Sequence, residues 1–114
     1  MSAFKPKIHE LGPSAASASQ GGVGTVAIIT AASNVNGILI KAASIHNSGG
    51  EGSILANALA PASSVDGRVI AHTGNGMAQS LTPMPIFIPA GLGVWLRNST
   101  GASTAAGNIT YELF

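Results

Sequence analysis

The stretch PIFIPAGLGVWL, residues 85–96, is the most informative part of the sequence for the fold. Two apolar runs flank Pro89 and Gly91, a pattern that predicts an antiparallel hairpin with its turn centred on Gly91 and Phe87 opposite Trp95. Because alternate side chains of a strand point to opposite faces, one face of this hairpin is expected to carry Ile86, Ile88, Val94 and Leu96. Both faces are then apolar, so we expect the Phe87 and Trp95 face to be covered by the chain's own N-terminal arm or by a neighbouring subunit.

The rest of the chain repeats this pattern of short, β-branched runs between turn residues, without a sustained helical period. Strands are expected at 25–30, 38–46, 53–59, 68–72, 78–81, 85–88, 93–98 and 108–114. The segment 53–59, SILANAL, would also suit one or two helical turns. Asn36-Gly37 and Asp66-Gly67 tolerate positive φ and are expected at corners. The predicted fold is all-β, a single jelly-roll or β-sandwich domain over residues 25–114.

Residues 1–24 are predicted to form an extended N-terminal arm. They contain Pro6 and Pro13, followed by a Ser/Ala/Gly run that disfavours both helix and strand. We expect this arm to lie on a partner or on the domain itself. In the last predicted strand Phe114 falls on the polar side. The candidates for interface contacts are Phe87, Trp95, Phe114, Phe4 and Ile8.

Charge is sparse throughout the chain: 8% of the 114 residues are charged, and the net charge is +1. An average soluble chain has roughly 25% charged residues, so much of this surface is expected to be small and polar or hidden against neighbours. The five cations are scattered, which argues against a nucleic-acid partner. The chain has no cysteine, and its sequence shows no apolar run typical of a signal peptide or a membrane span.

Residues typical of catalysis are few and isolated. His9, His46 and His72 have no ligand partner at metal-binding spacing, and no nucleophile-elbow motif surrounds a serine. We therefore expect no enzyme activity, no cofactor and no metal. Pro89-x-Gly91-x-x-Val94-x-x-x-Asn98 resembles the second cupin motif, with Val94 in place of the metal-binding histidine. A metal-dependent, cupin-like enzyme is accordingly a third hypothesis, and it would need the histidines to cluster in space.

Three segments resemble small virion proteins of tailed bacteriophages: TVAIITAASNVNGILIKAASI (25–45), PMPIFIPAGLGVWL (83–96) and NITYELF (108–114). The resemblance implies a jelly-roll or β-sandwich module, often trimeric, that decorates or cements the capsid. The implied partners are copies of the chain itself and the major capsid protein or another virion protein. The implied location is the virion, assembled in the host cytoplasm. Two alternatives remain open, a phage tail or fibre component and a carbohydrate-binding module in which Trp95 stacks on a sugar.

Overall fold

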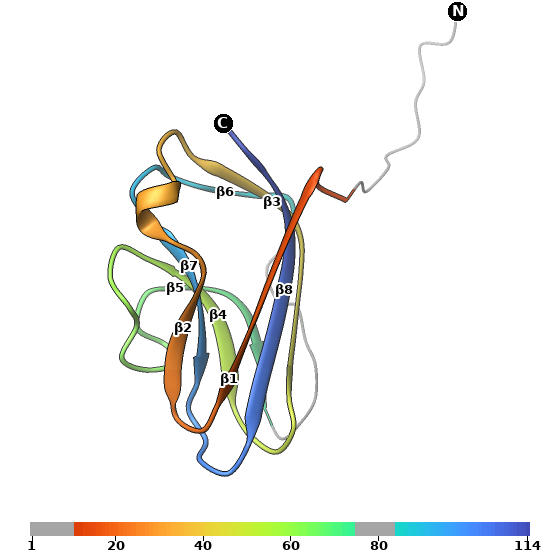
Figure 1. The fold of residues 1–114 in the computed structure, drawn as a ribbon, viewed down its shortest axis with the longest axis vertical. Helices are drawn as coiled ribbons and strands as arrows, with labels where there is room; N and C mark the ends of the chain where they lie inside the picture. Colours follow the sequence, from red (N-terminus) through yellow and green to blue (C-terminus); the bar gives the residue numbers. More distant parts are fainter. Residues whose placement is uncertain (1–10, 75–83) are drawn as a thin grey trace, which may run out of the picture.

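The computed structural model describes residues 11–74 and 84–114, which form two packed, four-stranded antiparallel sheets (Figure 1). Sheet A has the order β1-β8-β3-β6, and sheet B has the order β2-β7-β4-β5. A single 3₁₀ turn, η1 (Ala31–Ser33), is the one helical element in the described residues. The strands are β1 (Ser14–Gly21), β2 (Gly24–Ile29), β3 (Ile38–Asn47), β4 (Gly52–Asn57), β5 (Arg68–Thr73), β6 (Ile86–Ile88), β7 (Gly93–Asn98) and β8 (Thr104–Leu113).

The all-β sandwich expected from the sequence is confirmed, and its strand order is that of a jelly roll. Strand β1 pairs with β8, β2 with β7, β3 with β6 and β4 with β5, as in a long antiparallel ribbon folded over on itself. The chain therefore changes sheet after most of the described strands, and among these strands only β4 and β5 are consecutive neighbours within one sheet.

The core lies between the two sheets and consists mainly of β-branched side chains. Alternate residues of each strand point inward, which buries a continuous apolar layer that includes Ile38, Ile40, Ile45, Ile54, Ile88, Val94, Leu96 and Ile109. Gly107 of β8 also faces this layer, where an added Cβ would lie 3.1 Å from Ile54 Cδ1. The two sheets approach closely at this position because residue 107 has no side chain.

The predicted hairpin between residues 85 and 96 is wrong. Strand β6 pairs with β3 in sheet A, whereas β7 pairs with β2 and β4 in sheet B. Residues 89–92 carry the chain from one sheet to the other, with Gly91 at φ 87°. Phe87 and Trp95 are therefore not a cross-strand pair. Ile86, Ile88, Val94 and Leu96 do face the core as their alternation predicts, but they reach it from two different sheets instead of sharing one.

The expectation that residues 14–24 resist strand formation is also wrong. Ser14–Gly21 is an edge strand paired with β8 along its whole length, from Ser14 opposite Tyr111 to Gly21 opposite Thr104. Backbone pairing to β8 and packing of Ala16 and Ala18 against the core outweigh the low β propensity of an Ala/Ser run. Residues 1–10 lie outside the described residues.

The other predicted strands match the structure with small shifts at their ends. The segment predicted at 53–59 is strand β4, not a helix, and β8 begins four residues before the predicted start at 108. The strand predicted at 78–81 lies outside the described residues. Gly37 and Gly67 have φ values of 108° and 127°, which confirms the corners expected at Asn36-Gly37 and Asp66-Gly67.

Buried asparagines tie together the loops at the lower end of the sandwich in Figure 1. Asn98 is completely buried, and its Nδ2 donates to the carbonyl oxygens of Gln20 and Ser103, both at 3.1 Å. Its Oδ1 accepts from Asn47 Nδ2 and from the backbone N–H of Thr100, both at 3.0 Å. The β1–β2, β3–β4 and β7–β8 connections are thus held by one polar network, which the sequence patterns did not predict.

Candidate interaction surfaces

Two of the predicted interface residues meet at the upper end of the sandwich in Figure 1, where the C-terminus also lies. The rings of Phe87, on β6, and Phe114, after β8, have centroids 5.8 Å apart and an interplanar angle of 33°. Gly37 contacts both residues. The Phe87 ring lies against Gly37, and the Gly37 carbonyl oxygen accepts from the backbone N–H of Phe114 at 3.1 Å. A Cβ at Gly37 would collide with the Phe87 ring.

Asn34 holds the loops beneath this aromatic pair. Its Nδ2 donates to the carbonyl oxygens of Pro89 at 2.7 Å and Leu92 at 2.9 Å, and its Oδ1 accepts from the backbone N–H of Gly37 at 2.8 Å. Its own carbonyl accepts from the backbone N–H of Gly91 at 2.9 Å. Because Asn34 is almost fully buried, these bonds fix the β2–β3 connection against the β6–β7 connection.

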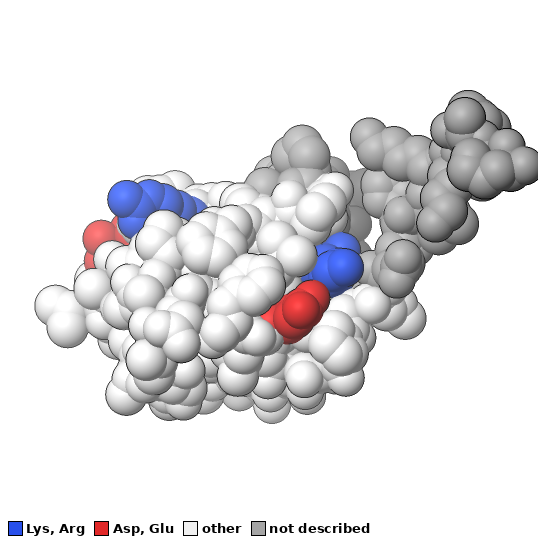
Figure 2. Space-filling model, turned by 90° about the horizontal axis from the view of Figure 1, so that it is seen from above, with Lys and Arg blue, Asp and Glu red and all other residues white. Residues whose placement is uncertain are grey.

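Large apolar side chains remain exposed at this end. Phe87 is 50% exposed and Phe114 is 55% exposed, although the two rings touch. Leu113, next to Phe114 in the chain, and Val35, two residues before Gly37, are exposed as well. We call Phe87, Phe114, Leu113 and Val35 the upper apolar cluster. Seen from above, the described surface is largely uncharged, with acidic and basic side chains at its left side and right of its centre (Figure 2).

Trp95 lies in sheet B and does not belong to this cluster. Its indole N–H donates to the carbonyl oxygen of Asn57 at 2.9 Å, and its side chain is half-buried. The β4–β5 loop, residues 58–67, folds back over this side of sheet B, where Thr25 Oγ1 donates to the Pro61 carbonyl at 2.7 Å. Leu55, next to Trp95 in register on β4, is completely buried. The cover expected over the Trp95 side is therefore supplied in part by this loop. Phe4 and Ile8 lie outside the described residues.

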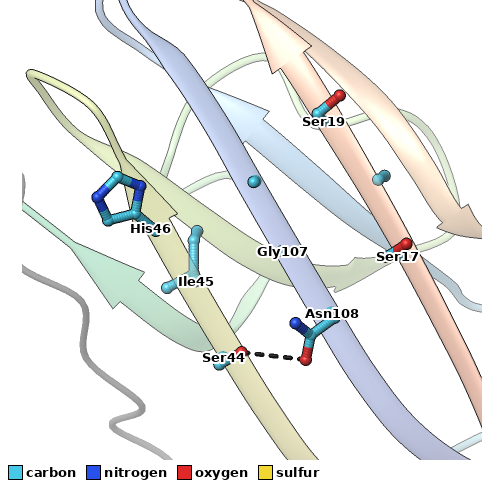
Figure 3. A pocket seen from close by; sticks show the side chains of 9 residues that line it. Ser17, Ser19, Ser44, Ile45, His46, Gly107 and Asn108 are labelled. Carbon is cyan, nitrogen blue, oxygen red and sulfur yellow. Dashed lines mark hydrogen bonds between the residues drawn. The ribbon is translucent and has the colours of Figure 1, made fainter.

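The outer face of sheet A has a shallow depression over β8 that is lined mainly by short, uncharged side chains, whereas Glu112 lies farther along the same side of β8. Its lining includes Ser17 and Ser19 of β1, Ser44 and His46 of β3, and Asn108 of β8 (Figure 3). Ser17, Asn108 and Ser44 lie side by side in register, and Ser44 Oγ donates to Asn108 Oδ1 at 3.0 Å. The depression exists because short side chains in the middle of the sheet leave the backbone of β8 close to the surface.

The two histidines in the described residues, His46 and His72, lie in different sheets. His46 is exposed on sheet A, His72 is in sheet B, and His9 lies outside the described residues. Within residues 11–74 and 84–114, no group of three or more His, Asp or Glu side chains is close enough to hold a metal ion. Ser53 Oγ and His72 Nδ1 are 2.8 Å apart, a Ser–His contact that sequence spacing did not reveal. Ser53 is completely buried, so its hydroxyl is not accessible to a substrate in this structure.

In the part of the chain that the structure describes, no helix has the length and apolar character required to cross a bilayer. Comparison with models of known protein families, with curated proteins and with solved structures found no match.

Proposed function

We propose that this chain is a non-enzymatic structural protein of a phage virion, which self-associates and docks on the capsid as a decoration or cement protein. The virion setting rests on the sequence resemblance. The observation that carries self-association is the upper apolar cluster, where two aromatic rings are packed on each other and still half-exposed. Contiguous exposed apolar groups on a folded domain mark interaction sites.

The second copy is the occupant that this cluster fits best. The four residues of the cluster are uncharged, and the nearest acidic residue in register is Glu112, which lies opposite Leu39 in the same row of sheet A as Phe87. Hiding the exposed half of each phenylalanine contributes about 1 kcal/mol per ring, which is weak for one contact. Symmetric association repeats the contact in every copy, and a particle surface then binds the assembly through several sites at once.

The outer face of sheet A supports docking on a larger protein surface. Its exposed residues are mostly Ser, Ala, Thr and Asn, which cost little entropy and little charge desolvation when they are covered. A flat face of this kind suits a broad contact with a capsid protein better than it suits a small molecule. A tail or fibre component would use the same two surfaces. The location of the chain in the particle distinguishes this alternative from a capsid decoration protein.

The carbohydrate-binding alternative depends on Trp95. Sugar stacking needs an open indole face, whereas this ring is half-buried and its N–H already donates to Asn57. The jelly-roll order is also found in lectins and cupins, so fold alone does not separate these functions. A glycan titration monitored by Trp95 fluorescence tests this alternative, and a saturable change would favour it.

Sedimentation velocity over a range of concentrations tests the proposal. We expect the wild-type chain to self-associate, and the double variant Phe87→Ser/Phe114→Ser to lose most of that association. The matched control is Leu59→Ser, which removes a side chain that is more exposed than either phenylalanine but lies in the β4–β5 loop. Equal loss in the control would show that the effect is not specific to the cluster.

Docking is tested on purified phage particles from the source. Mass spectrometry is expected to find the chain in the particles, and cryo-electron microscopy is expected to locate it on the head. A chain that stays monomeric at every concentration and is missing from the particles would overturn the proposal.

A further inference from the structure

Strand β1 is an edge strand of sheet A that lacks the usual features that prevent pairing with other chains. Folded proteins protect exposed edges with charges, prolines, bulges or very short strands, because an open edge pairs with other chains. The other three edge strands show such protection. Strand β6 has three residues, β2 has an irregularity between Ala27 and Ile29, and β5 begins with Arg68. Strand β1 has eight residues, SAASASQG, without a charge, a proline or a register shift.

The hydrogen-bonding groups along this edge can be assigned from the register. Gly22 donates to the Ser103 carbonyl at 2.8 Å and continues the β1–β8 ladder. In an antiparallel pair, hydrogen-bonded residues alternate with residues whose N–H and C=O point away. The backbone groups of Ala15, Ser17, Ser19 and Gly21 therefore point to the outside of sheet A. In the described residues, β8 is the one strand paired with β1.

We infer that β1 pairs antiparallel with β1 of a second copy of this chain, which joins two A sheets into one continuous sheet. A two-fold axis at Ala18 sets Ser17 opposite Ser19 and Ala15 opposite Gly21. The outward N–H and C=O groups of Ala15, Ser17 and Ser19 and the N–H of Gly21 are then placed to bond across the junction. The Gly21 carbonyl already accepts from Gln20 Nε2 at 3.2 Å, so that side chain has to turn away before the outermost bond forms. This inference deepens the proposed self-association, on which it rests, by naming the strand and the register.

The second copy fits this edge better than an unrelated peptide does. The strand has no charge, so no like charges meet across the two-fold axis, and its Ala and Ser side chains leave room for an identical strand. Edge strand β2 lies next to β1 in the other sheet and has Val26 and Ile28 only half-buried against the core. In the dimer, β2 of the second copy would approach across the same two-fold axis and cover Val26 and Ile28.

The size of the contact is sufficient for a weak dimer. The paired strands run for roughly 24 Å, and the side of a two-sheet sandwich is roughly 20 Å deep, so the contact hides on the order of 1,000 Å² in both copies together. This is close to the lower limit for a specific interface. The proposed Phe87 contact and the β1 contact use different strands, so both can operate in one assembly.

Two substitutions at Ser17 test the pairing by sedimentation velocity. Ser17→Pro removes an N–H that does not bond β8, and proline is tolerated on an edge strand at such a position. Ser17→Lys brings like charges together across the axis. Both are expected to weaken self-association by about tenfold or more. The control Ser44→Lys adds the same charge in the same row of sheet A, but on the inner strand β3, and is expected to leave pairing intact.

A cross-link tests the register. The chain has no cysteine, so a disulfide in Ala18→Cys forms only between copies. Directly opposed residues that are not hydrogen-bonded to each other lie about 4.5 Å apart at Cα, within disulfide range. We expect Ala18→Cys to form a covalent dimer on mild oxidation, and Ser44→Cys to stay monomeric on a non-reducing gel.

The outcomes separate this inference from the proposed function. Self-association that is unchanged by Ser17→Pro and Ser17→Lys, together with no Ala18→Cys dimer, would overturn β1 pairing and leave the proposed function standing. A wild-type chain that is monomeric at every concentration would overturn β1 pairing and the proposed self-association, and its absence from the particles as well would overturn the whole proposed function. Circular dichroism of each variant shows whether it is folded, and the cysteine variant gives an answer even if proline disturbs the strand.

Discussion

Replacing Asn98 by alanine is expected to be among the most destabilising polar substitutions in this chain. Within the described part of the chain, the Asn98 side chain makes five hydrogen bonds: one each to Gln20, Asn47 and Thr100, and two to Ser103. A net contribution of about 1 kcal/mol per bond would give about 5 kcal/mol. Several partners keep another bond, however: the Ser103 carbonyl still accepts from Gly22, and Asn47 Nδ2 still donates to Glu51. We therefore expect a loss of about 3 kcal/mol in the free energy of unfolding.

Urea unfolding monitored by the fluorescence of the single tryptophan measures this loss at fixed protein concentration. Asn108→Ala is the matched control, because Asn108 is exposed and its side chain bonds Ser44 on the sheet surface. It is expected to change stability by about 0.5 kcal/mol or less. If Asn98→Ala unfolded within about 1 kcal/mol of the wild type with an unchanged m value, the buried network would not hold the lower loops as described.

Three further substitutions test other parts of the structure. Gly37→Ala is expected to lower stability by about 1–3 kcal/mol, because alanine is strained at φ 108° and its Cβ collides with the Phe87 ring; thermal unfolding measures the shift. Gly107→Ala overpacks the space between the sheets and is expected to cost about 1–3 kcal/mol in urea unfolding. Trp95→Phe removes the indole N–H bond to Asn57 and is expected to cost about 1 kcal/mol by circular dichroism, with sedimentation unchanged.

The sequence predicted where most strands lie and which residues face the core, because alternation is a local property of each strand. It did not predict which strands pair. The run at residues 85–96 has the same in-and-out pattern whether it folds as a hairpin or crosses between sheets, and the jelly roll places β6 beside β3 and β7 beside β2 and β4. Strand β1 was missed for a related reason. Its Ala/Ser composition is typical of a loop, and only pairing with the distant β8 makes it a strand.

The candidate surfaces were predictable to a smaller extent. Phe87 and Phe114 were both selected from the sequence, but their contact depends on Gly37 and Asn34, which act through backbone geometry and buried hydrogen bonds. Buried asparagines such as Asn98 give no sequence signal, since this residue type is usually exposed. The Ser53–His72 contact likewise joins neighbouring strands β4 and β5 whose register was not known beforehand.

The positions of the two proposed contacts determine what kind of assembly they can build. Strand β1 is one edge of sheet A, and β6, which carries Phe87, is the opposite edge. A copy paired through β1 therefore keeps its upper apolar cluster free, and a copy joined through that cluster keeps β1 free. The β1 contact is two-fold and closes on itself after two copies, so growth beyond a pair requires the cluster. Two independent contacts on opposite edges suit a protein that covers a surface, because each copy then links neighbours in different directions. A chain with so few charges stays soluble most readily when both edges are occupied in this way.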